Sequence, residues 1–552
     1  MVTKLNAMDN SAFEIQGNIV DVVARRIFKG TVVVNDGKIE AIREETVNAN
    51  EYILPGLIDS HIHIESSMLI PSEFARLAVV HGTVGTVSDP HEIANVLGVP
   101  GVKFMIENGR KVPFKFNFGA PSCVPATPFE TAGARLGINE IQELLQMPEI
   151  KYLSEMMNFP GVLFNDAEVM AKLALAKKAG KPVDGHAPGV TGENAEKYIK
   201  AGISTDHECF SIEEAYEKIK YGMHILIREG SAAKNFETLY PLIDEYPDQV
   251  MLCSDDKHPN DLVAGHINLE VKRAIAKGMN VMNVLRCCTV NPVKHYNLDI
   301  GLLRVGDAAD FIRVDNLSDF NVLDTWVDGQ KVAEDGKTLI PGVHERPFNN
   351  FEIGKIQPSD IHIEPHGSHI RVQGAFDGQL ITEEIIAVPV IDGNNVVSDP
   401  THDILKMVVK NRYSEGPAAV GFIHNIGLKN GALASCVAHD SHNIVAVGID
   451  DASITAAINM IIDATGGISL VDGEIKLLLP LPFAGIMSGI DGYEVARLYD
   501  AMDKKAKEMG SPLSAPYMTL SFMALLVIPD LKLSDKGLFD GTSFSFSNVF
   551  VK

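Results

Sequence analysis

Apolar and polar residues alternate in several short runs near the start of the chain, and this alternation predicts β-strands. The runs cover residues 13–20, 26–34 and 38–42. The pair Asp36-Gly37 lies between the second and third runs, which is typical of a tight hairpin turn. Similar strand-like sequence returns at residues 301–339, so we predict one small β-sandwich built from residues 1–53 and 298–345.

Between residues 54 and 297, short apolar runs alternate with longer segments that have helical periodicity. This order predicts repeated βα units around a parallel sheet. Eight candidate strands end near His63, Asp89, Ala120, Glu155, His186, His207, Arg228 and Asp255. Eight units over about 240 residues match the size of a (β/α)8 barrel. The predicted fold class is therefore α/β, with a TIM-like barrel whose functional groups gather at the C-terminal ends of the strands.

Residues 361–552 are long and apolar enough to form a separate C-terminal domain, preceded by a linker at 341–360. Its sequence mixes predicted strands at 387–391 and 443–449 with a predicted helix over 451–464. We expect an α+β domain.

Composition narrows the possible partners. The chain has a formal charge of −24 and 46% hydrophobic residues, which disfavours general binding to nucleic acid or to anionic membranes. Six cysteines without a C-x-x-C pair are typical of free thiols in a reducing compartment. We find no signal-peptide pattern and no apolar run of membrane-spanning length, so the expectation is a cytoplasmic enzyme that binds small molecules or a second copy of itself.

Candidate metal ligands follow the predicted strands. His61 and His63 are separated by one residue, so in an extended strand both side chains project to one side. Further ligand-type residues follow later strands, in Asp184-Gly185-His186, Thr205-Asp206-His207-Glu208 and Cys253-Ser254-Asp255-Asp256. Imidazole together with carboxylate favours zinc, manganese or iron over magnesium or calcium.

Each candidate has an alternative structural role. A single H-x-H pair occurs by chance, and only the wider pattern favours metal binding. Asp256 competes with Asp255, which is preferred because it comes first after the predicted strand. The C-terminal residues His424, His439, Asp440 and His442 could form a second metal site or a lid, although ordinary hydrogen bonding accounts for them equally simply.

The order of these residues resembles the amidohydrolase superfamily of metal-dependent hydrolases. Three segments further resemble the bacterial and archaeal adenine deaminase family: Pro55-Gly56-Leu57-Ile58-Asp59-Ser60-His61-Ile62-His63, Asp89-Pro90-His91-Glu92-Ile93-Ala94-Asn95-Val96, and the stretch from His424 to Asn443. The resemblance extends over nearly the whole chain and includes the extra C-terminal domain.

This resemblance implies a set of metal ligands. They are His61, His63, His186, His207 and Asp255. A carboxylate from the fourth strand would allow two divalent cations per chain, Mn²⁺ or Fe²⁺ with Zn²⁺ as an alternative. Glu155 is the best-placed bridge, and Lys151 is the fallback because some relatives use a carboxylated lysine there.

The resemblance also implies the reaction, hydrolysis of adenine to hypoxanthine and ammonia. Asp255 would move protons as well as bind metal. Further candidates at the mouth are His91 and Glu92 for catalysis, and Asp89, Arg228 and Ser231 for substrate binding, although a helix cap or an ion pair in the barrel wall would also explain them.

Two other functions compete with this prediction. One is an amidohydrolase that acts on a different aminopurine or on a cyclic amide. The other is a scaffold protein that has lost its chemistry, which is disfavoured because all five expected ligand positions are present. A homodimer is plausible from the family resemblance.

Overall fold

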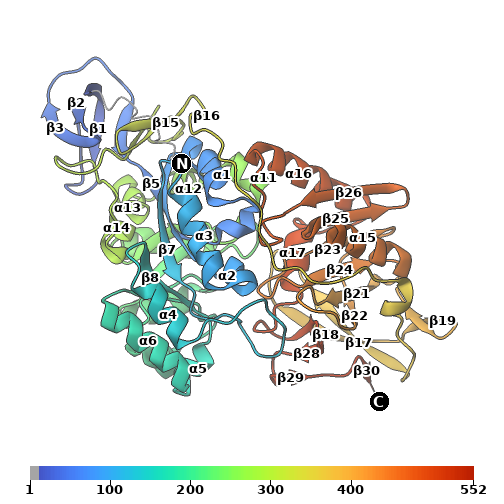
Figure 1. The fold of residues 1–552 in the computed structure, drawn as a ribbon. Helices are drawn as coiled ribbons and strands as arrows, with labels where there is room; N and C mark the ends of the chain where they lie inside the picture. The colour runs from blue at the N-terminus through green and yellow to red at the C-terminus, as the bar shows by residue number, and fades with distance from the viewer. Residues whose placement is uncertain (1–11, 552) are drawn as a thin grey trace.

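The computed structural model describes residues 12–551, which form a closed barrel, a curled β-sheet beside it and a larger β-sheet from the C-terminal part of the chain (Figure 1). The mixed α/β class and the barrel are as predicted. Residues 1–11 and 552 lie outside the described part of the chain, although they fall within the predicted N- and C-terminal units. The sequence-based prediction that the N-terminus has no signal peptide therefore also falls partly outside the described residues.

Eight parallel strands form the barrel wall. They are β5 (Leu57–Ile62), β6 (Thr83–Ser88), β7 (Lys115–Ala120), β8 (Ile150–Met156), β9 (Val183–Gly185), β10 (Thr205–Asp206), β11 (His224–Arg228) and β12 (Val250–Cys253). Backbone hydrogen bonds join β5 to β9 in one sheet and β10 to β12 in another. The Ser204 N–H donates to the Val183 carbonyl at 2.9 Å, and the Asp255 N–H donates to the His61 carbonyl at 2.9 Å. These two bonds connect the sheets into a closed ring.

Helices follow the strands and surround the barrel (Figure 1). Among them are α1 (Pro71–Ala78), α2 (His91–Leu97), α3 (Val99–Gly109), α4 (Ile138–Leu145), α6 (Ala167–Ala179), α7 (Gly192–Lys200), α8 (Ile212–Lys220) and α12 (Ile267–Ala276). Helix α8 shows why such a helix starts where it does: the hydroxyl of Ser211 accepts a hydrogen bond from the Glu214 N–H at 3.2 Å and caps the first turn.

The segments on either side of the barrel share one eight-stranded sheet. Its order is β16 (Lys337–Thr338), β15 (Gln330–Glu334), β14 (Val322–Val327), β13 (Phe311–Val314), β4 (Tyr52–Pro55), β1 (Phe13–Asp21), β2 (Arg26–Asn35) and β3 (Lys38–Glu44). Asp36 and Gly37, with φ of 48° and 72°, make the predicted turn between β2 and β3. The pairing of the two segments was predicted, but they form a single hydrogen-bonded sheet instead of two separate layers.

This sheet curls over its own core. Trp326 of β14 stacks on Phe311 with ring centroids 4.6 Å apart, and also on Phe13 of β1 at 6.5 Å. Since β14 and β1 are separated by two other strands, the two rings meet only because the sheet bends. A single curled sheet therefore encloses the apolar core that we predicted to lie between the two layers of a β-sandwich.

The C-terminal sheet has a long path of eight strands, with β30 (Phe550–Val551) paired beside it. The order is β18 (Thr382–Ala387), β17 (His369–Ala375), β22 (Ala419–His424), β21 (Ile404–Lys410), β24 (Ile444–Gly448), β23 (Ala432–Ser435), β25 (Gly467–Asp472) and β26 (Ile475–Pro480). In β24, Ile444 and Ala446 pack into one core cluster with helix α15 (Asp451–Ala464), while Val445 and Val447 belong to the cluster shared with the barrel. The centre of the sheet is therefore buried on both faces.

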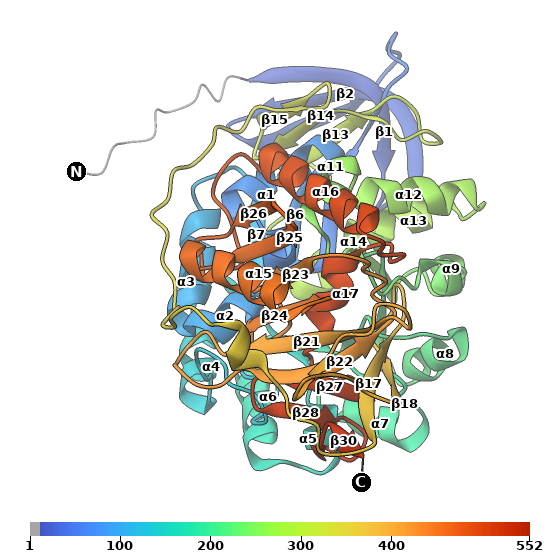
Figure 2. The same ribbon diagram turned by 90° about the vertical axis from the view of Figure 1, so that its right-hand side faces the viewer.

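Most predicted elements of this region are confirmed, including the helix over 451–464. The predicted strand at 387–391 is wrong, because β18 ends at Ala387 and β19 (Val390–Asp392) begins after Pro389. Proline has no N–H to donate, so it interrupts the ladder. The predicted linker crosses the outside of the molecule without a helix or strand until Pro358 (Figure 2). None of the helices within residues 12–551 has the length and apolarity that crossing a membrane demands.

A buried lysine in α8 generates a stability prediction. The ammonium of Lys218 donates to Asp206 at 2.5 Å, to Glu214 at 2.6 Å and to the Ala187 carbonyl at 2.7 Å. We expect Lys218→Met to lower the free energy of unfolding by about 3–5 kcal/mol, because the Asp206 charge stays buried without its partner. Urea denaturation followed by circular dichroism measures this loss.

Lys200→Met is the matched control, since Lys200 also pairs with a glutamate four residues earlier but is largely exposed. It should cost less than about 0.5 kcal/mol. Equal losses in the two variants would contradict the role assigned to Lys218.

Candidate metal centre and active site

The first group of ligand-type side chains lies where β5 and β12 meet. His61 lies near the end of β5, with its side chain in the barrel interior, and His63 follows that strand directly. The Nε2 atoms of the two histidines are 3.2 Å apart. Asp255 Oδ1 lies 3.6 Å from His61 Nε2 and 3.2 Å from His63 Nε2. All three residues are buried. The predicted neighbours along β5 and after β12 therefore converge on one point.

A second group comes from the next strands of the ring. His186 follows β9, His207 follows β10, and both face Glu155 near the end of β8. Glu155 Oε2 is 3.0 Å from His186 Nδ1 and 3.3 Å from His207 Nε2. The rings of His61 and His207 stack with centroids 4.2 Å apart, so the two groups are adjacent.

Glu155 lies between the two groups. Its Oε1 faces His63 Nε2 at 3.5 Å, while its Oε2 faces His186 and His207. Burial alone would raise the pKa of Glu155, but the charges and hydrogen bonds of His186 and His207 lower it well below its ordinary value. Lys151 lies at the opposite end of β8, away from the mouth of the barrel. Its charge contributes there to lowering the pKa of Lys181, after the larger effect of burial.

Backbone contacts orient the imidazoles. His63 Nδ1 donates to the Asp89 carbonyl at 3.1 Å, so its Nε2 carries the lone pair that points into the site. Asp206 Oδ1 accepts the N–H groups of Ala187 at 3.1 Å and Glu208 at 3.3 Å, the residues that follow His186 and His207. These contacts fix the loops that carry the ligands.

Arg228 is the buried cation of the site. It donates to Asp255 Oδ2 at 2.5 Å and to both oxygens of Glu208, with 2.9 Å from Nη2 to Oε2. Burial opposes ionisation of Asp255, but the guanidinium lowers the pKa of that carboxyl well below its usual range. Arg228 was predicted to bind substrate; the structure shows its guanidinium paired with Glu208 and Asp255 at the cavity wall. No separate sequence pattern points to Glu208.

Two predicted catalytic residues of α2 join this site to the C-terminal part of the chain. His91 Nδ1 lies 3.1 Å from Asp89 Oδ2, and His91 Nε2 lies 3.3 Å from Glu92 Oε1. Glu92 also accepts hydrogen bonds from His439 Nδ1 and His442 Nε2. Because His442 Nδ1 accepts the Ala438 N–H at 3.2 Å, its proton is on Nε2 and points at Glu92.

The cavity between these groups is small and roofed by apolar side chains. It has a volume of about 30 Å³. Its roof consists of Leu380, Phe522, Leu525 and Ile528, all from beyond residue 378. Phe522 is the last residue of α17 (Pro516–Phe522) and stacks on His439 with ring centroids 4.4 Å apart.

Two predicted residues lie away from the cavity. The Ser231 hydroxyl donates to Asp261 Oδ2 at 2.5 Å and accepts the His258 N–H at 2.9 Å, and both partners line a separate cavity of about 470 Å³. His424 ends β22 and is not among the residues that line the small cavity. Ser231 and His424 therefore do not line the small cavity, whereas His439 and His442 hydrogen-bond Glu92 of the barrel.

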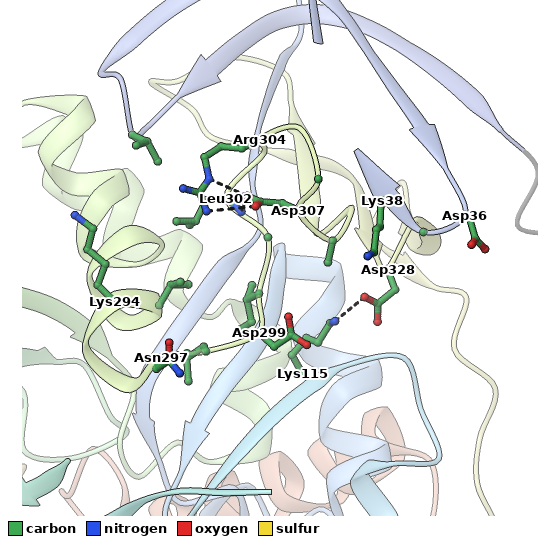
Figure 3. Close-up of a pocket in the computed structure, with 18 residues that line it drawn as sticks. Asp36, Lys38, Lys115, Lys294, Asn297, Asp299, Leu302, Arg304, Asp307 and Asp328 are labelled. Atoms are coloured by element: carbon green, nitrogen blue, oxygen red, sulfur yellow. Dashed lines mark hydrogen bonds and ion pairs between the residues drawn. The ribbon is translucent and has the colours of Figure 1, made fainter. Parts of the chain in front are cut away.

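A larger cleft of about 870 Å³ lies at the opposite end of the barrel, next to the curled sheet (Figure 3). Its charged side chains neutralise one another, with Arg304 paired to Asp307 at 3.0 Å and Lys115 to Asp328 at 2.6 Å. None of the predicted site residues lines it. Size alone therefore does not identify the functional site.

The donor set of the small cavity fits divalent transition metal ions. Buried histidine nitrogens and carboxylate oxygens lie within 4.8 Å of one another in overlapping groups, among them His61 with His207 and Asp255, and Glu155 with His186 and His207. Two imidazole nitrogens only 3.2 Å apart, next to ionised carboxylates, are arranged as ligands of one cation would be. Divalent ions would also compensate the buried negative charge.

Comparisons with known proteins agree with this geometry. Residues 52–332 match the model of the amidohydrolase family, and residues 379–545 match the model of the adenine deaminase C-terminal domain. An adenine deaminase from Methanosarcina mazei is 54% identical, with 97% of this chain and 99% of that protein covered. One from Sulfurovum sp. is 57% identical, again with 97% and 99% covered.

Among solved structures, the barrel region is similar to an N-acetyl-D-glucosamine-6-phosphate deacetylase from Mycobacterium smegmatis. The TM-score is 0.46 at 15% identity, with 58% of this chain and 100% of that chain covered.

The position of Glu155 generates a prediction about metal content. Glu155→Gln removes the negative charge that faces both groups of imidazoles, so we expect the divalent metal bound per chain to fall by at least about half. Elemental analysis of protein reconstituted with Mn²⁺ measures this.

Glu270→Gln is the matched control. Glu270 is also a buried barrel glutamate, but burial raises its pKa well above the ordinary value, and it does not line the small cavity. Its amide variant should bind as much metal as the unchanged protein. Equal metal content in both variants would remove Glu155 from the ligand set.

Proposed function

Because the chain belongs to the adenine deaminase family of amidohydrolases, we propose that it hydrolyses adenine to hypoxanthine and ammonia. The observation that carries this proposal is the convergence of buried imidazoles and carboxylates from the barrel with His439 and His442 from the family's C-terminal domain. We further propose three units, formed by residues 1–53 with 298–345, 54–297 and 361–552.

Six residues would hold two divalent ions, Mn²⁺ or Fe²⁺ with Zn²⁺ as an alternative. They are His61, His63, Glu155, His186, His207 and Asp255. Such ions, when bound, supply Lewis acidity that makes water nucleophilic at neutral pH. Glu155 would serve both ions, since its two oxygens face the two groups of imidazoles.

Asp255 moves protons in this proposal. Arg228 holds Oδ2 at 2.5 Å and keeps the carboxylate ionised, while Oδ1 remains directed at the imidazoles and the cavity. An ionised carboxylate in this position accepts a proton from the attacking water and returns it to the departing amine. The amine of adenine leaves only after it is protonated, so one residue performs both steps.

His91 and Glu92 act on the purine ring. Both line the cavity, and His91 is held on one side by Asp89 and on the other by Glu92. Those carboxylates outweigh the effect of burial and raise the pKa of His91 well above its ordinary value, so the imidazole can donate a proton. We assign His91 and Glu92 to hydrogen bonding with the ring and to proton delivery, with Asp89 as the residue that orients His91.

The lining of the cavity favours a neutral heterocycle. Arg228 is the one lysine or arginine among the lining residues, and it is already paired with two carboxylates. A phosphate-bearing substrate would require free cations at this position. The apolar roof formed by Leu380, Phe522, Leu525 and Ile528 suits a flat ring and keeps bulk water away from the reaction.

Turnover with a panel of nucleobases and cyclic amides tests the function. We expect the Mn²⁺-loaded protein to release ammonia from adenine, and chelation followed by readdition of metal to abolish and restore this activity. Asp255→Asn should lower kcat by about 10²–10⁴-fold, because the amide cannot accept the proton. Hypoxanthine is followed by its ultraviolet absorbance.

Asp261→Asn is the control, because Asp261 lies outside the small cavity and pairs with Ser231. Its turnover should stay close to that of the unchanged protein. Hydrolysis of a cyclic amide without release of ammonia from adenine would favour the other amidohydrolase activity. Full turnover of adenine without metal would contradict the mechanism.

A further inference from the structure

A buried lysine lies directly behind the roof of the active-site cavity. Lys532 belongs to β27 (Leu531–Ser534), a short strand that pairs with β28 (Gly537–Asp540) near the C-terminus. Its side chain is completely buried. Its ammonium donates to the carbonyl of Leu380 at 2.6 Å and to the carbonyl of Phe522 at 3.1 Å. Both acceptors belong to roof residues.

The burial of Lys532 is costly and has little charge compensation. The other fully buried lysines named here pair with carboxylates: Lys218 with Asp206 and Glu214, and Lys406 with Asp451. The two acceptors described for Lys532 are neutral carbonyls. Burial lowers the pKa of Lys532 to about 7, and the charge of Asp530 only partly opposes this. A group held at such expense calls for a role that an apolar side chain would not fill.

The two carbonyls belong to separate segments of the chain, and each segment also bonds to β27 next to Lys532: the Thr382 hydroxyl donates to the Leu531 carbonyl at 2.8 Å, and the Leu533 N–H donates to the Met523 carbonyl at 3.3 Å. Leu380 lies between β17 and β18, and Phe522 ends α17. The ammonium of Lys532 is the side-chain donor that joins the carbonyls of the two roof residues themselves. Phe522 in turn stacks on His439, which hydrogen-bonds Glu92. Contacts thus run without a break from Lys532 to a side chain of the barrel mouth.

We propose that Lys532 is a positioning residue for substrate binding, which holds Leu380 and Phe522 in the arrangement that closes the roof over the heterocycle. This inference rests on the proposed deamination of adenine and adds a residue that lies outside the metal-binding groups. Lys532 contacts neither metal ligands nor the reacting atoms. Its effect is therefore on the affinity for substrate and not on the proton transfers.

The test compares the kinetics of Lys532→Met and Lys532→Arg in the full-length, Mn²⁺-loaded protein with adenine as substrate. Methionine keeps the apolar stem but leaves the two carbonyls without their donor. We expect KM to rise about tenfold, because a tenfold change in affinity corresponds to roughly the contribution of one charge-assisted hydrogen bond. The value of kcat at saturation should change little. Arginine retains a donating cation and should recover part of the affinity.

Lys406→Met is the matched control. Lys406 is a fully buried lysine of β21 in the larger C-terminal sheet, bound to Asp451 at 2.6 Å and remote from the roof residues in its contacts. It should lower the melting temperature at least as much as Lys532→Met, yet leave KM unchanged. A purely structural role for Lys532 predicts the same behaviour for both variants.

The outcomes separate the two proposals. If the unchanged protein releases no ammonia from adenine, the proposed function fails before any variant is compared. If it does so, and folded Lys532→Met has an unchanged KM or loses kcat alone, the role of Lys532 is overturned. If Lys532→Met does not fold, the comparison of Lys532→Arg with Lys406→Arg decides: a higher KM in the first variant alone supports the proposal, and equal KM values overturn it.

Discussion

The burial of Glu155 among four imidazoles is the interaction on which the rest of the site depends. His63, His91, His186 and His207 all place a ring nitrogen 3.0–3.5 Å from its oxygens. An ionised carboxylate removed from water costs several kcal/mol unless positive charge or hydrogen bonds compensate it. The mouth of the barrel is therefore stable only with protons or cations between these side chains. The same requirement that stabilises the fold gathers donor atoms that could hold a metal ion.

Hydrogen bonds from backbone N–H groups to buried carboxylates hold these candidate ligands in place. Asp59 accepts the N–H groups of His61 at 3.3 Å and Ser254 at 3.0 Å, which ties β5 to β12 just below the first group. Asp206 does the same for the loops after His186 and His207, and Lys218 neutralises it. Buried carboxylates that accept backbone N–H groups thus fix the ring of strands, and the metal ligands inherit that geometry.

The barrel and the convergence of its histidines and acidic residues were predictable because they follow local periodicities. The spacing of His61 and His63 places both on one side of a strand, and each later ligand follows a short apolar run, so parallel strands bring them to one mouth. Glu208 gave no such signal beside His207. The contact of Ser231 with Asp261 was not predictable, because the strand pattern does not specify how the loop after β11 turns. Pro389 was also overlooked as the end of a strand.

What the sequence could not place is the contact between distant parts of the chain. Glu92 and His442 are separated by 350 residues, and no periodicity relates one to the other. Yet His439 and His442 orient Glu92, and the roof residues close a cavity of about 30 Å³ over the ligands. A barrel mouth without this cover would be open to bulk water, which weakens electrostatic interactions. The C-terminal part of the chain therefore belongs to the candidate site in the same physical sense as the strands of the barrel: its connecting segments and α17 supply hydrogen bonds and an apolar surface next to the buried charges.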